Sequence, residues 1–235
     1  GAQATGAFSS ASGAGATAAG LQSTANGYKA EATTDYSTAV GAFSSASGGR
    51  TSAFGYGAAA AGDYASALGY SARASGEDAT ALGASAWATA AQTTAVGQFA
   101  WATAQGGTAI GQDAYAYSGI NATALGSNAW ASGSNSVALG AGSRASEANV
   151  VSVGGGNGVS APATRRITNL GAALNATDAV NKAQLDAVAA VAAVAGEASA
   201  DFQSSGSGVA SASGVDSTAA GAGATASGLR STALG

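Results

Sequence analysis

Small, aliphatic and glycine residues recur along this chain with a period of fourteen. The repeated unit is a small or β-branched residue, then Ala, then an apolar residue, then Gly. It occurs at 38–41, 52–55, 66–69, 80–83, 94–97, 108–111, 123–126 and 137–140, and as VSVG at 151–154. One extra residue separates Gly111 from Gly126. A fixed period over so many copies is typical of a solenoid, in which each repeat stacks on the next.

The composition of each repeat favours strands over helices. Each unit carries two or three Gly together with β-branched residues, and both types are unfavourable in helix interiors. Fourteen residues suffice for two short strands and two turns. We therefore predict an all-β, parallel β-roll in which each strand pairs in register with its equivalent one coil further on.

The two strands of a coil differ in pattern. In T-A-V-G the Thr and aliphatic columns face one way, the Ala column faces the other, and neither face is polar. One face would line the coil and the other would meet another chain, and we expect the Thr column to point inward with the aliphatics. The second strand has a small residue, then a variable residue, then Ala, so we expect one of its faces to be exposed to solvent. These patterns predict a flattened roll that packs on copies of itself about a symmetry axis.

The variable, outward column contains a run of aromatic residues flanked by arginines. Its members are Glu31, Ser45, Ala59, Arg73, Trp87, Trp101, Tyr115, Trp130 and Arg144. Neighbours in this column should lie about 4.8 Å apart across the sheet. Two interpretations stay open: a ladder that stiffens the roll, or a contact strip for a ligand. The candidate contact strip comprises Arg73, Trp87, Trp101, Tyr115, Trp130 and Arg144.

Two places depart from the regular repeat. The extra residue falls within 117–120. We expect a turn to absorb it, because Trp130 and Leu139 lie again at the expected positions of their columns. Deleting Gly119 should therefore be tolerated. Upstream, GAFSSASG occurs at 6–13 and 41–48, but Asn26 replaces the aliphatic residue. The repeat pattern is weaker in these first coils.

After Gly154 the pattern ends in a glycine-rich stretch that contains the only proline, Pro162. We predict a helix with Thr177 as N-cap and Asp178 in its first turn, ending near Ala195. Two apolar seams of coiled-coil spacing compete, and neither is preferred; they are Leu185, Val188, Ala192, Ala195 and Val180, Ala187, Val191, Val194. The repeat restarts at 217–235. The predicted domains are a β-roll (1–154), a connector (155–177), a coiled coil (178–200) and the start of a second β-roll (201–235).

Composition removes most catalytic chemistry. The 235 residues include no His, Cys or Met, so no Ser/His, Cys/His or His-metal site can form. Glu77 and Asp78 are adjacent in a predicted turn, which indicates solvation rather than acid–base work. The net charge of −4 is spread singly, which disfavours nucleic-acid and membrane-surface binding. We expect no enzyme activity, no cofactor and no metal.

The TALG and NSVALG coils, followed by RRITN and TDAVNKAQL, resemble the head and neck of YadA-like trimeric autotransporter adhesins. The resemblance implies a left-handed parallel β-roll, a homotrimer, and a neck and stalk in which Ile167, Val180, Leu185 and Val188 join the chains. It also implies a bacterial cell-surface protein of the outer membrane whose anchor lies outside this sequence. The longest apolar run, 187–196, is too short to span a bilayer, and we expect the sequence to be part of a longer protein.

The implied function is attachment to host cells, matrix proteins or surfaces by multivalent, non-covalent contact. A passive spacer that raises another binding domain is the structural alternative. An ice-binding solenoid is a weaker one, because it needs outward Thr ladders.

Overall fold

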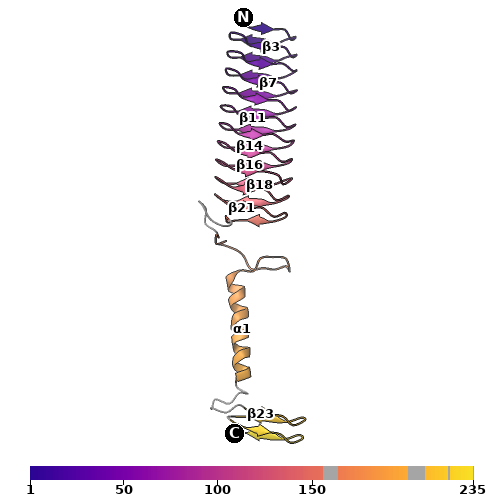
Figure 1. Ribbon diagram of the computed structural model, residues 1–235, viewed down its shortest axis with the longest axis vertical. Helices are drawn as coiled ribbons and strands as arrows, with labels where there is room; N and C mark the ends of the chain where they lie inside the picture. The colour runs from indigo at the N-terminus through magenta and orange to yellow at the C-terminus, as the bar shows by residue number, and fades with distance from the viewer. Residues whose placement is uncertain (156–163, 201–209, 222, 235) are drawn as a thin grey trace. The chain divides into compact units, whose positions relative to one another are not determined.

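Two parallel sheets of eleven strands each build the first part of the protein (Figure 1). The computed structural model describes residues 1–155, 164–200, 210–221 and 223–234. The chain divides into two units, Gly1–Arg165 and Arg166–Gly235, and each is described by itself.

Sheet A holds the two-residue strands. They are β1 (Gln3–Ala4), β3 (Thr17–Ala18), β5 (Glu31–Ala32), β7 (Ser45–Ala46), β9 (Ala59–Ala60), β11 (Arg73–Ala74), β13 (Trp87–Ala88), β15 (Trp101–Ala102), β17 (Tyr115–Ala116), β19 (Trp130–Ala131) and β21 (Arg144–Ala145). In each strand the first residue points out of the roll and the second into it.

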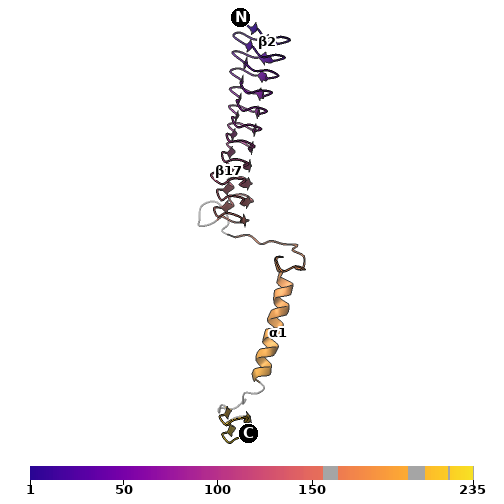
Figure 2. The same ribbon diagram turned by 90° about the vertical axis from the view of Figure 1, so that its right-hand side faces the viewer.

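Sheet B holds the strands of the T-A-V type. They are β2 (Ser10–Ser12), β4 (Thr24–Asn26), β6 (Thr38–Val40), β8 (Ser52–Phe54), β10 (Ser66–Leu68), β12 (Thr80–Leu82), β14 (Thr94–Val96), β16 (Thr108–Ile110), β18 (Thr123–Leu125), β20 (Val137–Leu139) and β22 (Val151–Ser152). Figure 2 shows sheets A and B as two separate stacks of strands.

The pairing confirms the predicted period and register. Each strand pairs in parallel with its equivalent fourteen residues away, as Ser66 does with Thr80, or fifteen residues away across the extra residue, as Thr108 does with Thr123. The first coils are as regular as the rest, since Thr24–Asn26 pairs in register with Thr38–Val40. The parallel β-roll predicted from the sequence is therefore correct, and it extends through the coils in which the repeat pattern is weaker.

The interior of the roll is filled almost entirely by alanine. The Ala column of sheet B and the second residue of the sheet A strands are buried where coils stack on both sides, as Ala81 and Ala88 illustrate, whereas Ala4 of the first strand is exposed. Seven buried Ser and Thr side chains complete this layer; they are Ser23, Ser37, Ser44, Thr51, Thr93, Ser136 and Ser143. Each of their hydroxyls donates to a backbone carbonyl oxygen three or four residues earlier, so these polar groups are buried at little cost.

The expected inward position of the Thr column is wrong. Because two layers of Ala methyl groups fill the roll, the Thr and aliphatic columns of sheet B lie on its outer surface. The Thr side chains are partly exposed or exposed, and Leu68 is 51% exposed, Leu82 41% and Ile110 38%. This whole face is therefore unpartnered in a single chain.

In nearly every coil, each of the two turns contains one residue with φ between 51° and 71°, besides the glycine that follows the sheet B strand. Along one edge of the roll these include Tyr36, Arg50 and Tyr64, and along the other Lys29 and Phe43, all with φ between 53° and 59°. Non-glycine residues seldom adopt this conformation. Its repetition in successive coils shows that the turn geometry is imposed by stacking rather than by residue type.

The extra residue near 118 is absorbed in a turn, as the sequence predicts. Thr108 pairs with Thr123 and Tyr115 with Trp130, so both columns keep their faces. The structure identifies the inserted residue as Ser118, which has φ of 69°. Gly119 instead takes the place that Gly133 holds in the next coil, and a Cβ there would lie 2.4 Å from the Gly133 carbonyl.

The second unit begins with a neck loop and contains helix α1 (Lys182–Ala200). The predicted N-cap, Thr177, is wrong, because the helix begins five residues later. Asn181 caps it: its Oδ1 accepts from the backbone N–H of Gln184 at 3.1 Å, and Gln184 Oε1 accepts from the backbone N–H of Asn181 at 3.4 Å. This is the reciprocal arrangement of a capping box.

Asp178 stabilises the neck loop rather than the first helical turn. One of its carboxylate oxygens accepts from the backbone N–H groups of Asn175 at 2.9 Å and Leu174 at 3.0 Å. The hydrogen bonds from Asn175 and Leu174 hold the pKa of Asp178 below its ordinary value.

Four further strands restart the coil pattern: β23 (Ser211–Ala212), β24 (Thr218–Ala220), β25 (Thr225–Ala226) and β26 (Thr232–Leu234). Ser211 pairs with Thr225 and Thr218 with Thr232, again fourteen residues apart. Residues 156–163 of the predicted segment 155–177, which include Pro162, lie outside the described residues. The predicted domain boundaries stay a prediction.

Candidate binding surface

The candidate strip forms one continuous column on the outer face of sheet A. Arg73 pairs in register with Trp87, Trp87 with Trp101, Tyr115 with Trp130, and Trp130 with Arg144. The four aromatic residues are half-buried, whereas both arginines are exposed. The structure thus brings together the six side chains that the sequence grouped.

The rings of this strip stack on one another along the roll. The centroids of Trp87 and Trp101 are 4.9 Å apart with an interplanar angle of 3°. Trp101 meets Tyr115 edge-on at 5.4 Å, and Tyr115 stacks on Trp130 at 5.1 Å. Such pairs contribute about 0.5–1.5 kcal/mol each beyond the area they bury. The half-buried rings of the strip therefore support one another along the roll within one chain.

Arginine closes both ends of the stack. The Arg73 guanidinium lies 5.7 Å from the centroid of the Trp87 ring, and that of Arg144 lies 5.5 Å from Trp130. These are cation–π distances. Most ring faces are therefore covered by a neighbouring ring or a guanidinium, and the strip exposes mainly ring edges and two positive charges.

Sequence reasoning missed a second aromatic row on the turns that follow sheet B. Its members, Tyr28, Phe43, Tyr56 and Tyr70, come from four successive coils, with adjacent centroids 5.3 to 5.6 Å apart. The spacing of Tyr56 and Tyr70 is the regular fourteen, but Phe43 stands one position beyond the column of Tyr28. A search that allowed such a shift within a turn would have found the row.

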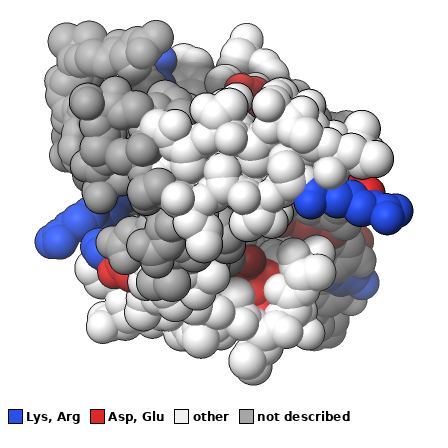
Figure 3. All heavy atoms as spheres, turned by 90° about the horizontal axis from the view of Figure 1, so that it is seen from below, with Lys and Arg blue, Asp and Glu red and all other residues white. Residues whose placement is uncertain are grey.

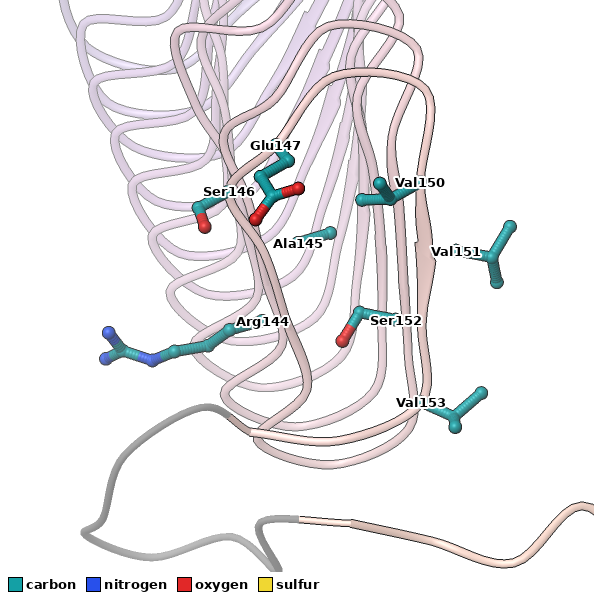
Figure 4. A pocket seen from close by; sticks show the side chains of 8 residues that line it. All are labelled: Arg144, Ala145, Ser146, Glu147, Val150, Val151, Ser152 and Val153. Atoms are coloured by element: carbon teal, nitrogen blue, oxygen red, sulfur yellow. The ribbon is translucent and has the colours of Figure 1, made fainter.

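The last coil ends in a hollow of about 380 Å³ next to β21 and β22. Figure 4 shows Arg144 pointing away from this hollow, with Val151 and Val153 directed to the opposite side of the roll. Arg165 closes part of this end, since its guanidinium donates to Ser143 Oγ at 2.8 Å and to the carbonyl oxygens of Ala141 and Val153. The hollow is the place where a further coil would stack.

Ionised side chains do not gather into a site on the described surface. Within the described residues, no group of three or more acidic side chains could hold a metal ion. Figure 3 shows mostly uncharged atoms on the face it presents, with small groups of positively and negatively charged atoms, some of them next to each other. Glu77 and Asp78 are exposed, and both lie in a turn.

The proposed neck and stalk residues are exposed in the single chain. Ile167 is 67% exposed, and Val180, Leu185 and Val188 are similarly accessible. The two apolar seams predicted for the coiled coil remain alternative predictions. In the described part of the chain, no helix has the length and hydropathy that crossing a membrane requires.

Comparison with known families identifies these elements. The YadA head domain repeat matches residues 18–44, 46–72, 74–100, 118–143, 131–157 and 212–235. These segments cover more than half of the chain. The coiled stalk of trimeric autotransporter adhesins matches residues 166–208. The chain belongs to the trimeric autotransporter adhesins.

A solved structure supports the same relationship. The roll of this adhesin is similar to the crystal structure of the collagen-binding domain of the Yersinia adhesin YadA, with 30% sequence identity and a TM-score of 0.54. The match covers 77% of this chain and 86% of that one. No curated protein matches this adhesin by sequence.

Proposed function

We propose that this adhesin forms a homotrimeric head at the bacterial cell surface, held at the outer membrane. It attaches the cell to host cells, matrix proteins or other surfaces by non-covalent contact. Three identical rolls present each weak site three times, which raises the effective concentration of the second and third contacts. The similarity to a collagen-binding domain makes matrix proteins the first ligand class to test.

The trimer is supported by the outer face of sheet B. Its aliphatic column runs along the roll and is partly or largely exposed, as Leu68, Leu82 and Ile110 illustrate. A long apolar face of this kind is typical of an interface between chains. Together with the exposed apolar residues Ile167, Val180, Leu185 and Val188, it supports three chains joined along the head, the neck and the stalk.

The strip from Arg73 to Arg144 is the proposed contact surface. It lies on sheet A, opposite the face assigned to the trimer interface, so trimerisation leaves it accessible. Aromatic residues and arginine are the residue types most enriched in the energetically dominant parts of binding interfaces. The pairing of a stiff aromatic stack with two exposed arginines supports this assignment.

The test replaces Trp87, Trp101, Tyr115 and Trp130 together by Ser. We expect the variant to remain a folded trimer and to lose binding in a solid-phase screen against collagen, fibronectin, laminin and abiotic surfaces. The matched control replaces Phe8 and Phe99, which are exposed aromatic residues outside the strip, and should bind as the parent does. Full affinity of the quadruple variant for every ligand of the parent contradicts the assignment.

A passive spacer is the second candidate, and the closure of the stack favours it. Arg73 and Arg144 cover the outer rings, so the strip is complete without a ligand. In this case the parent protein shows no affinity in the same screen, while the quadruple variant still melts at a lower temperature.

A further inference from the structure

The roll has two edges, and each is formed by one kind of turn. The first edge contains the turns that lead from sheet B to sheet A, such as 55–58. The second edge contains the turns that lead from sheet A back to sheet B, such as 61–65. Because sheets A and B lie face to face, the two edges lie on opposite sides of the roll, as the turns in Figure 1 show.

The first edge carries the aromatic row of Tyr28, Phe43, Tyr56 and Tyr70. Tyr28 meets Phe43 edge-on, and Tyr56 stacks on Tyr70 with an interplanar angle of 8°. All four side chains are between 45% and 61% exposed. The Lys29 ammonium lies 5.4 Å from the Tyr28 centroid and 5.8 Å from that of Phe43. This edge therefore presents apolar surface and one positive charge.

The second edge carries an arginine between two tyrosines. The Arg50 guanidinium lies 5.4 Å from the Tyr36 centroid and 5.6 Å from that of Tyr64, and it donates to the Tyr64 hydroxyl at 3.0 Å. Asp35 and Asp63 flank this group, and their carboxylates accept from backbone N–H groups of the preceding coil. Tyr36 and Tyr64 are 45% and 53% exposed.

The two clusters occupy the same coils. Along the chain the edges alternate as Tyr28, Tyr36, Phe43, Arg50, Tyr56, Tyr64 and Tyr70, so each group on one edge has a counterpart on the other within half a coil. Further along, the second edge becomes polar, with Asn121, Asn135 and Asn149 linked by side-chain hydrogen bonds of 3.3 Å. The match in height is thus a property of this segment rather than of every coil.

Symmetry determines which surfaces meet when three rolls assemble. If sheet B of each roll faces a three-fold axis that runs along the stack, the edges of neighbouring rolls come together. A rotation about this axis brings the first edge of one chain against the second edge of the next, at the same height. This step rests on the proposed trimer.

We propose that the two edges form an aromatic belt between chains. In it, Tyr28, Phe43, Tyr56 and Tyr70 of one chain pack against Tyr36, Arg50 and Tyr64 of a second copy, and Lys29 lies at the height of the partner's Asp35. The belt continues the apolar face of sheet B at both of its margins. It aligns the three chains along the axis, because a slip of one coil would move rings and charges out of register.

Cysteine cross-linking tests the belt directly, since the chain contains no native cysteine. The variant carries Tyr56→Cys and Tyr64→Cys in the full 235-residue chain and is treated with a short bis-maleimide. Each cross-link then joins an edge of one chain to the facing edge of the next chain in the trimer. We expect most of the protein to run at three chain masses on a denaturing gel.

Three controls exclude incidental coupling. In Tyr56→Cys alone and in Tyr64→Cys alone, every chain carries its single thiol on the same edge. Equal edges of neighbouring chains do not meet in the proposed trimer, so each variant should remain at one chain mass. Tyr56→Cys with Asn135→Cys keeps opposite edges but separates the thiols by about 25 Å along the roll, given strand spacings of about 4.8 Å. It should also remain at one chain mass.

Sedimentation of the same samples separates the two proposals. A trimer whose Tyr56→Cys and Tyr64→Cys chains stay unlinked overturns the belt and leaves the trimer in place, with both edges open to other ligands. A folded monomer overturns the belt and the proposed trimer together.

Discussion

Sheets A and B present apolar side chains to the outside in different ways. On sheet A the rings of Trp87 and Trp101 stack on each other, and Arg73 covers the end of the row. On sheet B the aliphatic side chains lie side by side with nothing above them, so Leu68 remains 51% exposed. The rings on the outer face of sheet A cover one another within one chain, whereas the aliphatic column of sheet B stays exposed. This difference supports the proposal that sheet B faces other copies and that sheet A faces a ligand.

The largest effect is expected from charge on sheet B. Replacing Leu68 and Leu82 by Asp places carboxylates in the proposed interface, where burying each ion costs several kcal/mol. We predict that the variant no longer forms a trimer, as measured by sedimentation at micromolar concentration. The same change at Ala59 and Ser45, outward positions on sheet A, should leave the trimer intact. A trimeric Leu68→Asp, Leu82→Asp variant would place the interface elsewhere.

A smaller effect is expected from opening the stack on sheet A. Trp101→Ser removes contacts with both Trp87 and Tyr115, and should lower the free energy of unfolding by about 1–3 kcal/mol. The protein should remain a trimer. Arg73→Ala removes only one cation–π contact, and about 0.5–1 kcal/mol should be lost. Equal losses for the two variants in thermal or denaturant unfolding would show that the rings do not act as a stack.

The turn between β17 and β18 offers a sharper test of the repeat itself. Deleting Ser118 restores the regular fourteen-residue coil, and the stability should change by less than about 0.5 kcal/mol. Deleting Gly119 moves the Ser118 Cβ against the Gly133 backbone, and we expect a loss of about 1 kcal/mol. The loss stays small because other coils accommodate side chains at this position: Thr34, Ala90, Ala104 and Glu147. A greater loss from deleting Ser118 than from deleting Gly119 would contradict the assignment of the inserted residue.

The smallest effect concerns the loop before α1, where Asp178 accepts hydrogen bonds from the backbone N–H groups of Leu174 and Asn175 of the same chain. Backbone N–H groups hold the pKa of Asp178 low, so its contribution to stability is present above the unfolded-state pKa. That contribution is lost as pH falls through the lower folded-state pKa. Unfolding followed between pH 5 and pH 2 should show a weaker acid dependence for Asp178→Asn than for the parent. If the stability of Asp178→Asn and of the parent depended on pH in the same way, the acid sensitivity would come from other groups.

The sequence was sufficient to predict the period, the two strands per coil and the outward column of Trp87 on sheet A. In a stack of equal coils, residues one period apart pair with each other, so the repeat defines the register. The outward position of Thr could not be predicted, since the pattern does not say whether Ala or the aliphatics fill the roll. Asn26 illustrates the consequence: it interrupts the aliphatic column without disturbing β4, because that column is not part of the interior. The helix does not start after Thr177, because Thr177 and Asn181 are both favourable N-cap residues and only Asn181 is followed three residues later by a Gln that bonds back to it.

Sedimentation equilibrium of the parent chain at micromolar concentration tests the central claim most directly. We propose that the outer face of sheet A is complete within one chain and that the outer face of sheet B is covered only by other copies. We therefore expect a single species of three chain masses. A folded monomer, with the aliphatic column of sheet B stably exposed to water, would contradict it.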